Sequence, residues 1–232
     1  MIPTLVRPLF DFMLPPRCPG CAVIVAEDHR FCADCWAQLT FLTAEGCARC
    51  SVPLAPHDGL VCASCLRSPP AYDAVIAGVA YGEVAKRVAL RLKYARRPGL
   101  ARTMAAILAP RLPEGATLVP VPLHRWRLWG RGFNQSVAIA RALQSRRALP
   151  CSVEILRRDR ATPSLRGLDP NQRRRAVKGA FTMRVRLDGL HILLIDDVLT
   201  TGATANACAA VLKRAGAVKV TLVCWARVIS DD

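Results

Sequence analysis

The fold of this chain is decided by the stretch Ile192-Leu193-Leu194-Ile195-Asp196-Asp197-Val198-Leu199-Thr200-Thr201-Gly202-Ala203-Thr204. Its apolar beginning, from His191 to Ile195, predicts a buried parallel strand, because such strands are apolar on both faces. If the strand continued, Asp196 and Asp197 would point to opposite faces. We therefore expect the chain to turn at this pair, at the carboxyl edge where open α/β sheets bind ligands.

The second half of the stretch predicts an anion site. Thr200, Thr201 and Thr204 supply hydroxyl groups, and Gly202 tolerates backbone angles that bring N–H groups together. The residues that follow, 205–215, have the pattern of a helix. Free amides and the dipole at a helix N-terminus hold a phosphate group well. The plain structural alternative is a buried strand followed by a Thr-capped helix.

This arrangement is similar to the signature of the type I phosphoribosyltransferases, which bind 5-phosphoribosyl-1-diphosphate (PRPP) together with Mg²⁺. The resemblance implies that Asp196 and Asp197 contact the ribose 2′ and 3′ hydroxyls. It also implies that the loop holds the 5′-phosphate through Thr200, Thr201, Gly202, Ala203 and Thr204.

Charge is distributed unevenly along the 232 residues. The formal net charge is +16, with −2 in residues 1–65 and +18 in residues 66–232, so the second part favours polyanionic partners. No uninterrupted apolar run reaches eighteen residues, and we expect no integral membrane insertion. Residues 1–16 predict a short amphipathic segment that packs on the body, with peripheral membrane contact as the second interpretation.

Eight of the eleven cysteines form four Cys-x-x-Cys pairs: Cys18 and Cys21, Cys32 and Cys35, Cys47 and Cys50, Cys62 and Cys65. The offsets between the first and second four are 29 or 30 residues, which indicates an internal duplication. Each half has the spacing of a tetrathiolate zinc ribbon, so we expect two structural Zn²⁺ ions. Sequential and interleaved pairing fit this spacing equally well. Disulfide bonds are the alternative.

The remaining segments alternate between strand and helix patterns. Residues 72–81 and 117–121 predict strands, and residues 83–97, 100–112 and 136–147 predict helices. Alternation of this kind indicates an α/β fold with a parallel sheet flanked by helices. We therefore divide the chain into an N-terminal segment (1–16), a double zinc ribbon (17–68) and an α/β domain (69–232).

Cations in the α/β domain are candidates for the diphosphate. A loop after Val121 would present N–H groups, with Arg125, Arg131 and Lys93 adding charge. Residues 157–186 are rich in Arg and turn residues, which is typical of a mobile lid, and Arg160 lies in this segment. A solvated linker or a nucleic-acid contact explains the same residues.

From about Leu14 to Arg227 the chain resembles the ComF (competence protein F) family, which joins a double zinc ribbon to a phosphoribosyltransferase domain. Besides the cysteines and residues 196–204, the resemblance rests on Arg91-Leu92-Lys93-Tyr94, Val119-Pro120-Val121-Pro122-Leu123-His124, Arg131-Gly132-Phe133-Asn134-Gln135, Arg160-Ala161-Thr162-Pro163 and Lys178-Gly179-Ala180-Phe181. It implies a bacterial, cytoplasmic protein linked to DNA uptake.

Two functions follow from this resemblance. In the first, the protein is an enzyme that transfers phosphoribosyl from Mg²⁺-bound PRPP, with Asp196, Asp197 and Arg131 as catalytic residues and Lys93 and Arg160 as further PRPP contacts. In the second, it is a non-catalytic accessory of DNA uptake that binds single-stranded DNA and senses PRPP. A zinc head that serves only as a protein docking module is a third interpretation.

Overall fold

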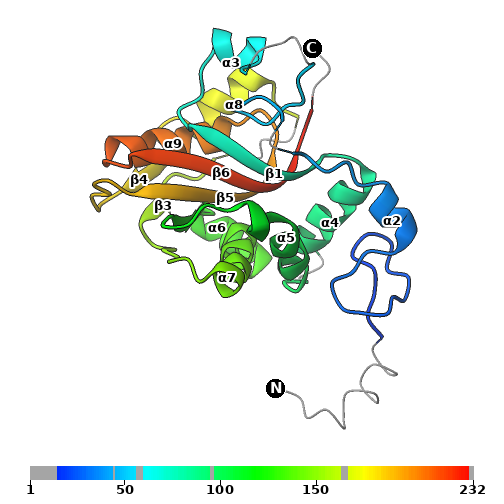
Figure 1. Ribbon diagram of the computed structural model, residues 1–232. Coiled ribbons are helices and arrows are strands. Elements are labelled where there is room, and N and C mark those ends of the chain that lie inside the picture. Colours follow the sequence, from blue (N-terminus) through cyan, green and yellow to red (C-terminus); the bar gives the residue numbers. More distant parts are fainter. Residues whose placement is uncertain (1–14, 44, 56–59, 95–96, 163–166, 230–232) are drawn as a thin grey trace.

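The computed structural model describes residues 15–43, 45–55, 60–94, 97–162 and 167–229 (Figure 1). Most of the amphipathic segment predicted for residues 1–16 therefore lies outside the described residues. The elements in chain order are α2 (Ala33–Ala37), α3 (Ala63–Arg67), β1 (Ala74–Ala80), α4 (Glu83–Tyr94), α5 (Leu100–Leu108), the 3₁₀-helix η1 (Ala109–Arg111), β2 (Thr117–Pro120), α6 (Arg125–Arg131), α7 (Gln135–Arg147), β3 (Leu156–Arg158), α8 (Pro170–Val177), β4 (Phe181–Met183), β5 (His191–Leu199), α9 (Ala203–Arg214) and β6 (Lys219–Arg227).

Four strands form a central parallel sheet in the order β1-β6-β5-β2. Helices α4, α5 and α7 pack on one face, around Leu193 and Ile195 of β5. Helix α9 packs on the other face, around Ile192 and Leu194 (Figure 1). All four of these β5 side chains are fully buried, as expected for a strand that is covered on both sides. The predicted α/β fold is confirmed.

Strand β5 corrects one expectation. The chain does not turn at the carboxylate pair, because β5 stays paired with β6 through Leu199. The two carboxylates nevertheless reach partners on the same side of the sheet, because Asp197 contacts Lys93 of α4 and Asp196 contacts Ser136 of α7. The strand continues because β6, which is itself buried over most of its length, pairs with it on both sides of Asp197.

The segment predicted as a mobile lid, residues 157–186, contains regular structure. Strands β3 and β4 pair antiparallel, and the buried Arg158 guanidinium lies over the Phe181 ring. Helix α8 begins at a capping box in which Asp169 accepts from the N–H of Gln172, and Gln172 reaches back to the Asp169 N–H. This Asp-Pro-x-Gln start is a sequence signal for a helix. Pro163 and its neighbours through 166 lie outside the described residues.

Helix α6 was also not predicted, because its seven residues follow a proline-rich stretch and precede a glycine. It ends at Gly132, whose φ of 78° closes the helix in the left-handed region. The helix predicted for residues 100–112 is divided into α5 and η1. Pro110 lies in η1 and cannot donate to an α-helical hydrogen bond, which explains the change.

The two ribbons occupy different places against the α/β domain. In the first (residues 15–42), Phe31 stacks on the buried Trp225 with ring centroids 6.4 Å apart, and Arg91 of α4 donates to the Pro19 carbonyl at 3.0 Å. In the second (residues 45–70), Ser51 donates to the Val75 carbonyl of β1 at 2.5 Å. Figure 1 shows α2 of the first ribbon near α4 and α3 of the second near α8.

Candidate functional site

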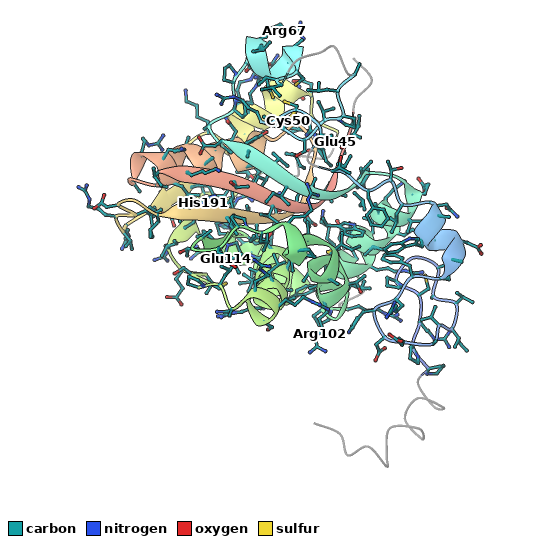
Figure 2. The ribbon with its side chains drawn as sticks, in the orientation of Figure 1. Glu45, Cys50, Arg67, Arg102, Glu114 and His191 are labelled. Carbon is teal, nitrogen blue, oxygen red and sulfur yellow. The ribbon has the colours of Figure 1, made fainter. Side chains whose placement is uncertain are left out.

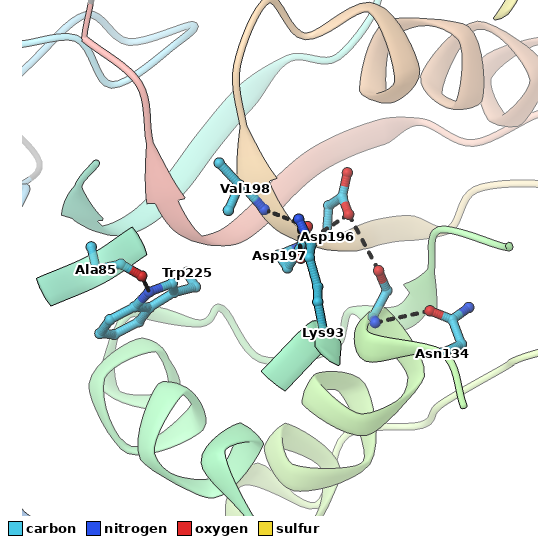
Figure 3. Close-up of polar contacts among 8 residues, drawn as sticks. Ala85, Lys93, Asn134, Asp196, Asp197, Val198 and Trp225 are labelled. Carbon is cyan, nitrogen blue, oxygen red and sulfur yellow. Dashed lines mark hydrogen bonds and ion pairs between the residues drawn. The ribbon is translucent and has the colours of Figure 1, made fainter. Parts of the chain in front are cut away.

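The Asp197 carboxylate is held by an ion pair. Its Oδ2 lies 2.7 Å from Lys93 Nζ, near the end of α4, and its Oδ1 accepts from the Val198 N–H at 2.8 Å. Asp197 is 7 % exposed, so the charge of Lys93 largely replaces the water that this carboxylate loses on folding. Lys93 was predicted as a PRPP contact, and the structure places it directly at the acidic pair (Figure 3).

The Asp196 carboxylate is held by a chain of hydrogen bonds from α7. Ser136 Oγ donates to Asp196 Oδ1 at 3.3 Å, and the Ser136 N–H donates to Asn134 Oδ1 at 2.9 Å. Asn134 Nδ2 in turn donates to the Val121 carbonyl at 3.0 Å, just after β2. The chain fixes the start of α7 between β2 and β5 (Figure 3). Ser136 and Asn134 had no predicted role at the site, although Asn134 is recognisable in the sequence as a helix N-cap.

Burial raises the pKa of Asp196 to about 7, and the negative charge of Asp197 acts in the same direction. The Asp197 N–H, the Lys93 charge and the Ser136 hydroxyl favour the ionised form and offset part of this rise. A carboxyl group that titrates near neutral pH is a feature of functional sites.

The predicted phosphate loop joins β5 to α9. Gly202 has a φ of 73°, which favours glycine, and a Cβ there would lie 3.2 Å from the Tyr72 hydroxyl, a tight contact. Its carbonyl accepts from the Asn206 N–H at 2.7 Å, which begins the helical hydrogen bonds of α9. Thr200 and Thr201 are exposed, whereas Thr204 is half-buried in the first turn. The loop thus presents hydroxyl groups at the N-terminus of a twelve-residue helix.

The remaining predicted cations take different positions. Arg160 donates to the carbonyls of Ala176 and Lys178 and so closes the end of α8. Arg125 lies over the Trp126 ring on α6, 5.5 Å from its centroid. Arg131 is the last residue of α6, and its side chain lies outside the described part of the structure. A different residue, Arg173, donates to Thr200 Oγ1 at 3.1 Å.

The segment predicted as a lid contains a buried arginine, Arg158, for which no separate role was predicted. Arg158 is 9 % exposed and donates to Thr162 Oγ1, while Arg127 donates to the Thr162 carbonyl at 3.0 Å. Burial lowers the pKa of Arg158, and the nearby Arg127 charge adds to the effect. Within the described residues, its Nε has no hydrogen-bond partner. The burial of Arg158 follows from the alternation of side chains along β3. Because β3 itself was not predicted, this signal could not be used.

The eight paired cysteines form two clusters: Cys18, Cys21, Cys32 and Cys35 in the first ribbon, and Cys47, Cys50, Cys62 and Cys65 in the second. Within each cluster the sulfur atoms all lie within 4.8 Å of one another. Zn–S bonds of about 2.3 Å in a tetrahedron place sulfurs about 3.8 Å apart, so both clusters fit Zn²⁺. The pairing is therefore sequential, a point that the spacing had left open, and all eleven cysteines are free of disulfide bonds.

Equivalent contacts recur in the two ribbons. The Cys32 N–H points to Cys18 Sγ at 3.4 Å, and the Cys62 N–H points to Cys47 Sγ at 3.3 Å. These N–H···S contacts stabilise thiolate ligands. The internal duplication expected from the cysteine offsets is thus visible in the geometry as well. Four cysteine ligands in each centre make both zinc sites closed and structural.

Two tetrathiolate zinc centres ahead of a parallel α/β sheet define the class of this protein, a double-zinc-ribbon protein with an α/β domain. Residues 9–66 match the family model of the double zinc ribbon domain. The described residues contain no helix both long and apolar enough to span a membrane.

Comparison with known proteins identifies the family. The chain is 31 % identical over 226 residues to the DNA utilization protein YhgH of Salmonella typhi, covering 93 % of this chain and 99 % of that protein. It is 28 % identical over 213 residues to competence protein F of Haemophilus influenzae, covering 86 % and 85 %. The chain belongs to the ComF family.

Among solved structures, the chain is similar to a glutamine PRPP amidotransferase from B. subtilis in complex with ADP and GMP. The sequence identity is 18 %, the TM-score is 0.41, and the match covers 58 % of this chain and 30 % of the amidotransferase chain.

Proposed function

We propose that this protein binds Mg²⁺-PRPP at the carboxyl end of β5. Asp196 and Asp197 contact the ribose hydroxyls, and the loop from Thr200 to Thr204 holds the 5′-phosphate. The observation that carries the proposal is the short distance along the chain between the carboxylate pair, of which Asp197 is buried and Asp196 half-buried, and a hydroxyl-rich loop at a helix N-terminus. An anion binds at the loop, and a sugar diol binds beside it.

Two cations support this assignment. Lys93 already contacts the acidic pair, and Arg173 already contacts Thr200. Because Arg173 is on α8, within the segment predicted as a lid, its position links that segment to the phosphate loop. The Mg²⁺ ion is part of the substrate complex, where it neutralises the diphosphate. We assign Arg160 to support of α8 and not to direct contact with PRPP.

We further propose that the bound PRPP is a phosphoribosyl donor. In the transfer, the bond between the anomeric carbon and the diphosphate oxygen breaks, and its electron pair leaves with the Mg²⁺-diphosphate. A nucleophilic atom of the acceptor supplies the electron pair of the new bond to the anomeric carbon, and an acceptor that carries a proton on this atom releases it to water. The transition state is oxocarbenium-like, and the protein contributes by positioning the sugar and stabilising the leaving group.

Calorimetry of Mg²⁺-PRPP with the zinc-loaded protein tests the site. The wild type should bind Mg²⁺-PRPP with micromolar affinity, and the Asp196→Asn/Asp197→Asn variant should bind it at least about a hundredfold more weakly. Ribose 5-phosphate serves as a matched ligand, because it retains the 5′-phosphate and lacks the diphosphate. Equal PRPP affinity in the wild type and the variant would exclude the acidic pair as the ribose site. Diphosphate release by Asp196→Asn at the wild-type rate would exclude its catalytic role.

A second candidate function is single-stranded DNA binding in DNA uptake, favoured by a specific surface on α6. Trp126 and Trp129 are 59 % and 80 % exposed, and their ring centroids lie 6.1 Å apart. Exposed tryptophans beside arginines, such as Arg125 here, stack on bases and contact phosphates. The relatives named for DNA utilization and competence support the same role. In this function PRPP binding serves as a signal without turnover.

Fluorescence titration with a dT oligonucleotide tests the second function. Binding should weaken steeply with salt, and Trp126→Ala/Trp129→Ala should weaken it about tenfold or more. Trp36→Ala is the matched control, because Trp36 is 52 % exposed but lies in the first ribbon. Binding that is insensitive to salt, or that the double variant leaves unchanged, would exclude α6 as the nucleic-acid surface.

A further inference from the structure

A cavity of about 870 Å³ lies between the second zinc ribbon and the phosphate loop. Its ribbon wall runs from Cys50 to Leu54 and from Val61 to Pro70, and its opposite wall includes Tyr72, Thr200–Ala203 and Val228. A cavity of this size is typical of small-molecule sites. Neither Asp196 nor Asp197 lines it. The cavity therefore offers space beyond the acidic pair where we place the ribose of PRPP.

The charges of the lining have one sign. Three arginines line the cavity, namely Arg67 of α3, Arg174 of α8 and Arg227 at the end of β6, and the described lining residues include no Asp or Glu. Arg227 is half-buried, and within the described part of the chain its Nε is buried without a hydrogen-bond partner. The Arg227 charge acts on Cys50 and Tyr72, two residues of the lining. Guanidinium groups bind carboxylates and phosphates through two parallel hydrogen bonds.

The rest of the lining combines apolar side chains with short polar ones. Pro53, Leu54, Pro69 and Pro70 come from the second ribbon, and the buried Tyr72 ring lies across from them. Such side chains favour a ligand with a planar apolar body. Short polar groups line both walls, at Ser64 and Ser68 on the ribbon side and at Thr200, Thr201 and Asn206 on the phosphate-loop side.

We propose that this cavity binds the phosphoribosyl acceptor and that the acceptor is a small planar anion, such as an aromatic carboxylate. The acceptor role rests on the proposed function; the anion site does not. The second ribbon then forms part of the substrate site, whereas the first ribbon packs against α4 and Trp225 at another place on the domain. Figure 2 labels Arg67 and Cys50 on the side of the molecule that carries the second ribbon.

Calorimetry with two probes that differ mainly in charge, nicotinate and nicotinamide, tests the proposal on the full-length, zinc-loaded protein. Nicotinate should bind at least about tenfold more tightly than nicotinamide, because charge-assisted hydrogen bonds to arginine discriminate by this much. The Arg227→Gln variant should remove this preference. Arg227 also lies near Cys50 of the zinc centre, so a second variant that changes only exposed residues, Arg67→Gln/Arg174→Gln, is tested beside it. This variant should weaken the binding of nicotinate at least threefold.

Arg102→Gln is the control, because Arg102 is exposed on α5 and lies far from the second ribbon (Figure 2). Equal affinity for the two probes, no binding of nicotinate at millimolar concentration, or nicotinate binding that all arginine variants leave unchanged would overturn the proposal. Titration with Mg²⁺-PRPP separates it from the proposed function. If PRPP binds and nicotinate does not, the acceptor site is rejected and the PRPP site is retained. If nicotinate binds through these arginines and PRPP does not, the PRPP site is rejected and the anion site is retained.

Discussion

Lys93 Nζ lies 2.7 Å from Asp197 Oδ2, and this contact joins α4 to the strand that carries the acidic pair. The two side chains are 24 % and 10 % exposed, so neither charge is well solvated. The pair is consequently a structural element as well as part of the candidate site. Lys93 supplies a counter-charge to a carboxylate that has little contact with water.

Lys93→Met should lower the free energy of unfolding by about 2–3 kcal/mol, because it leaves a buried carboxylate without its counter-charge. Denaturant unfolding at pH 8 measures the effect. Lys86→Met is the matched control on the same helix, since Lys86 pairs with Glu83 at the surface and should contribute less than about 1 kcal/mol. The double variant Lys93→Met/Asp197→Leu should recover most of the loss; a double variant as unstable as the single one would contradict the assignment.

PRPP affinity should depend on pH through Asp196. With a pKa of about 7, this carboxyl group is mostly ionised at pH 8 and mostly protonated at pH 6. If the ionised form is required, affinity should fall about tenfold between these values. Calorimetry at each pH measures it, with Asp196→Asn to correct for titration of the PRPP phosphates. If the PRPP affinities of the wild type and of the variant change in parallel with pH, Asp196 does not control binding.

Asp196→Asn should stabilise the free protein above neutral pH. The pKa of Asp196 is higher in the folded chain than its ordinary value of 3.8, so the contribution of this group to stability is present below about pH 4 and is lost as the pH rises through 7. Asparagine resembles the protonated form at every pH. In thermal unfolding, the free energy of unfolding of the variant should therefore exceed that of the wild type by about 1 kcal/mol or more at pH 8, and this difference should disappear near pH 4. A constant difference across this range would point to packing, not charge.

Loss of zinc should have unequal consequences in the two ribbons. The wild type should contain two Zn²⁺ ions, and Cys35→Ser and Cys65→Ser should each contain one. Cys35 packs in the same core cluster as Trp225, whereas Cys65 belongs to a small separate cluster. The first variant should therefore lower the thermal midpoint of the whole protein more than the second. Metal analysis with calorimetric unfolding checks both points, and equal midpoints would contradict the unequal coupling.

The sequence patterns predicted those structural elements whose signals lie within a few neighbouring residues. The apolar run before Asp196, the helix after Gly202 and the eight zinc ligands were all identified, because hydrophobic runs, glycine at a turn and cysteine spacing act within a few residues. The same local signals were present for α8, in its Asp169 cap and Pro170, but the density of arginines around them indicated a mobile loop instead. Arg158 was missed because a three-residue strand has too short a pattern to identify.

The sequence by itself determined that this protein has two zinc ribbons, a parallel sheet and a loop rich in threonine and glycine after the acidic pair. Tertiary structure decided which groups meet there. Ser136 reaches Asp196 across 60 positions of the chain, and the Ala71 N–H reaches the Asn206 carboxamide oxygen across 135. Such contacts depend on which helices cover each face of the sheet and on where the second ribbon packs. The pairing of distant groups is set by burial of apolar surface over the whole molecule, so no local pattern specifies it.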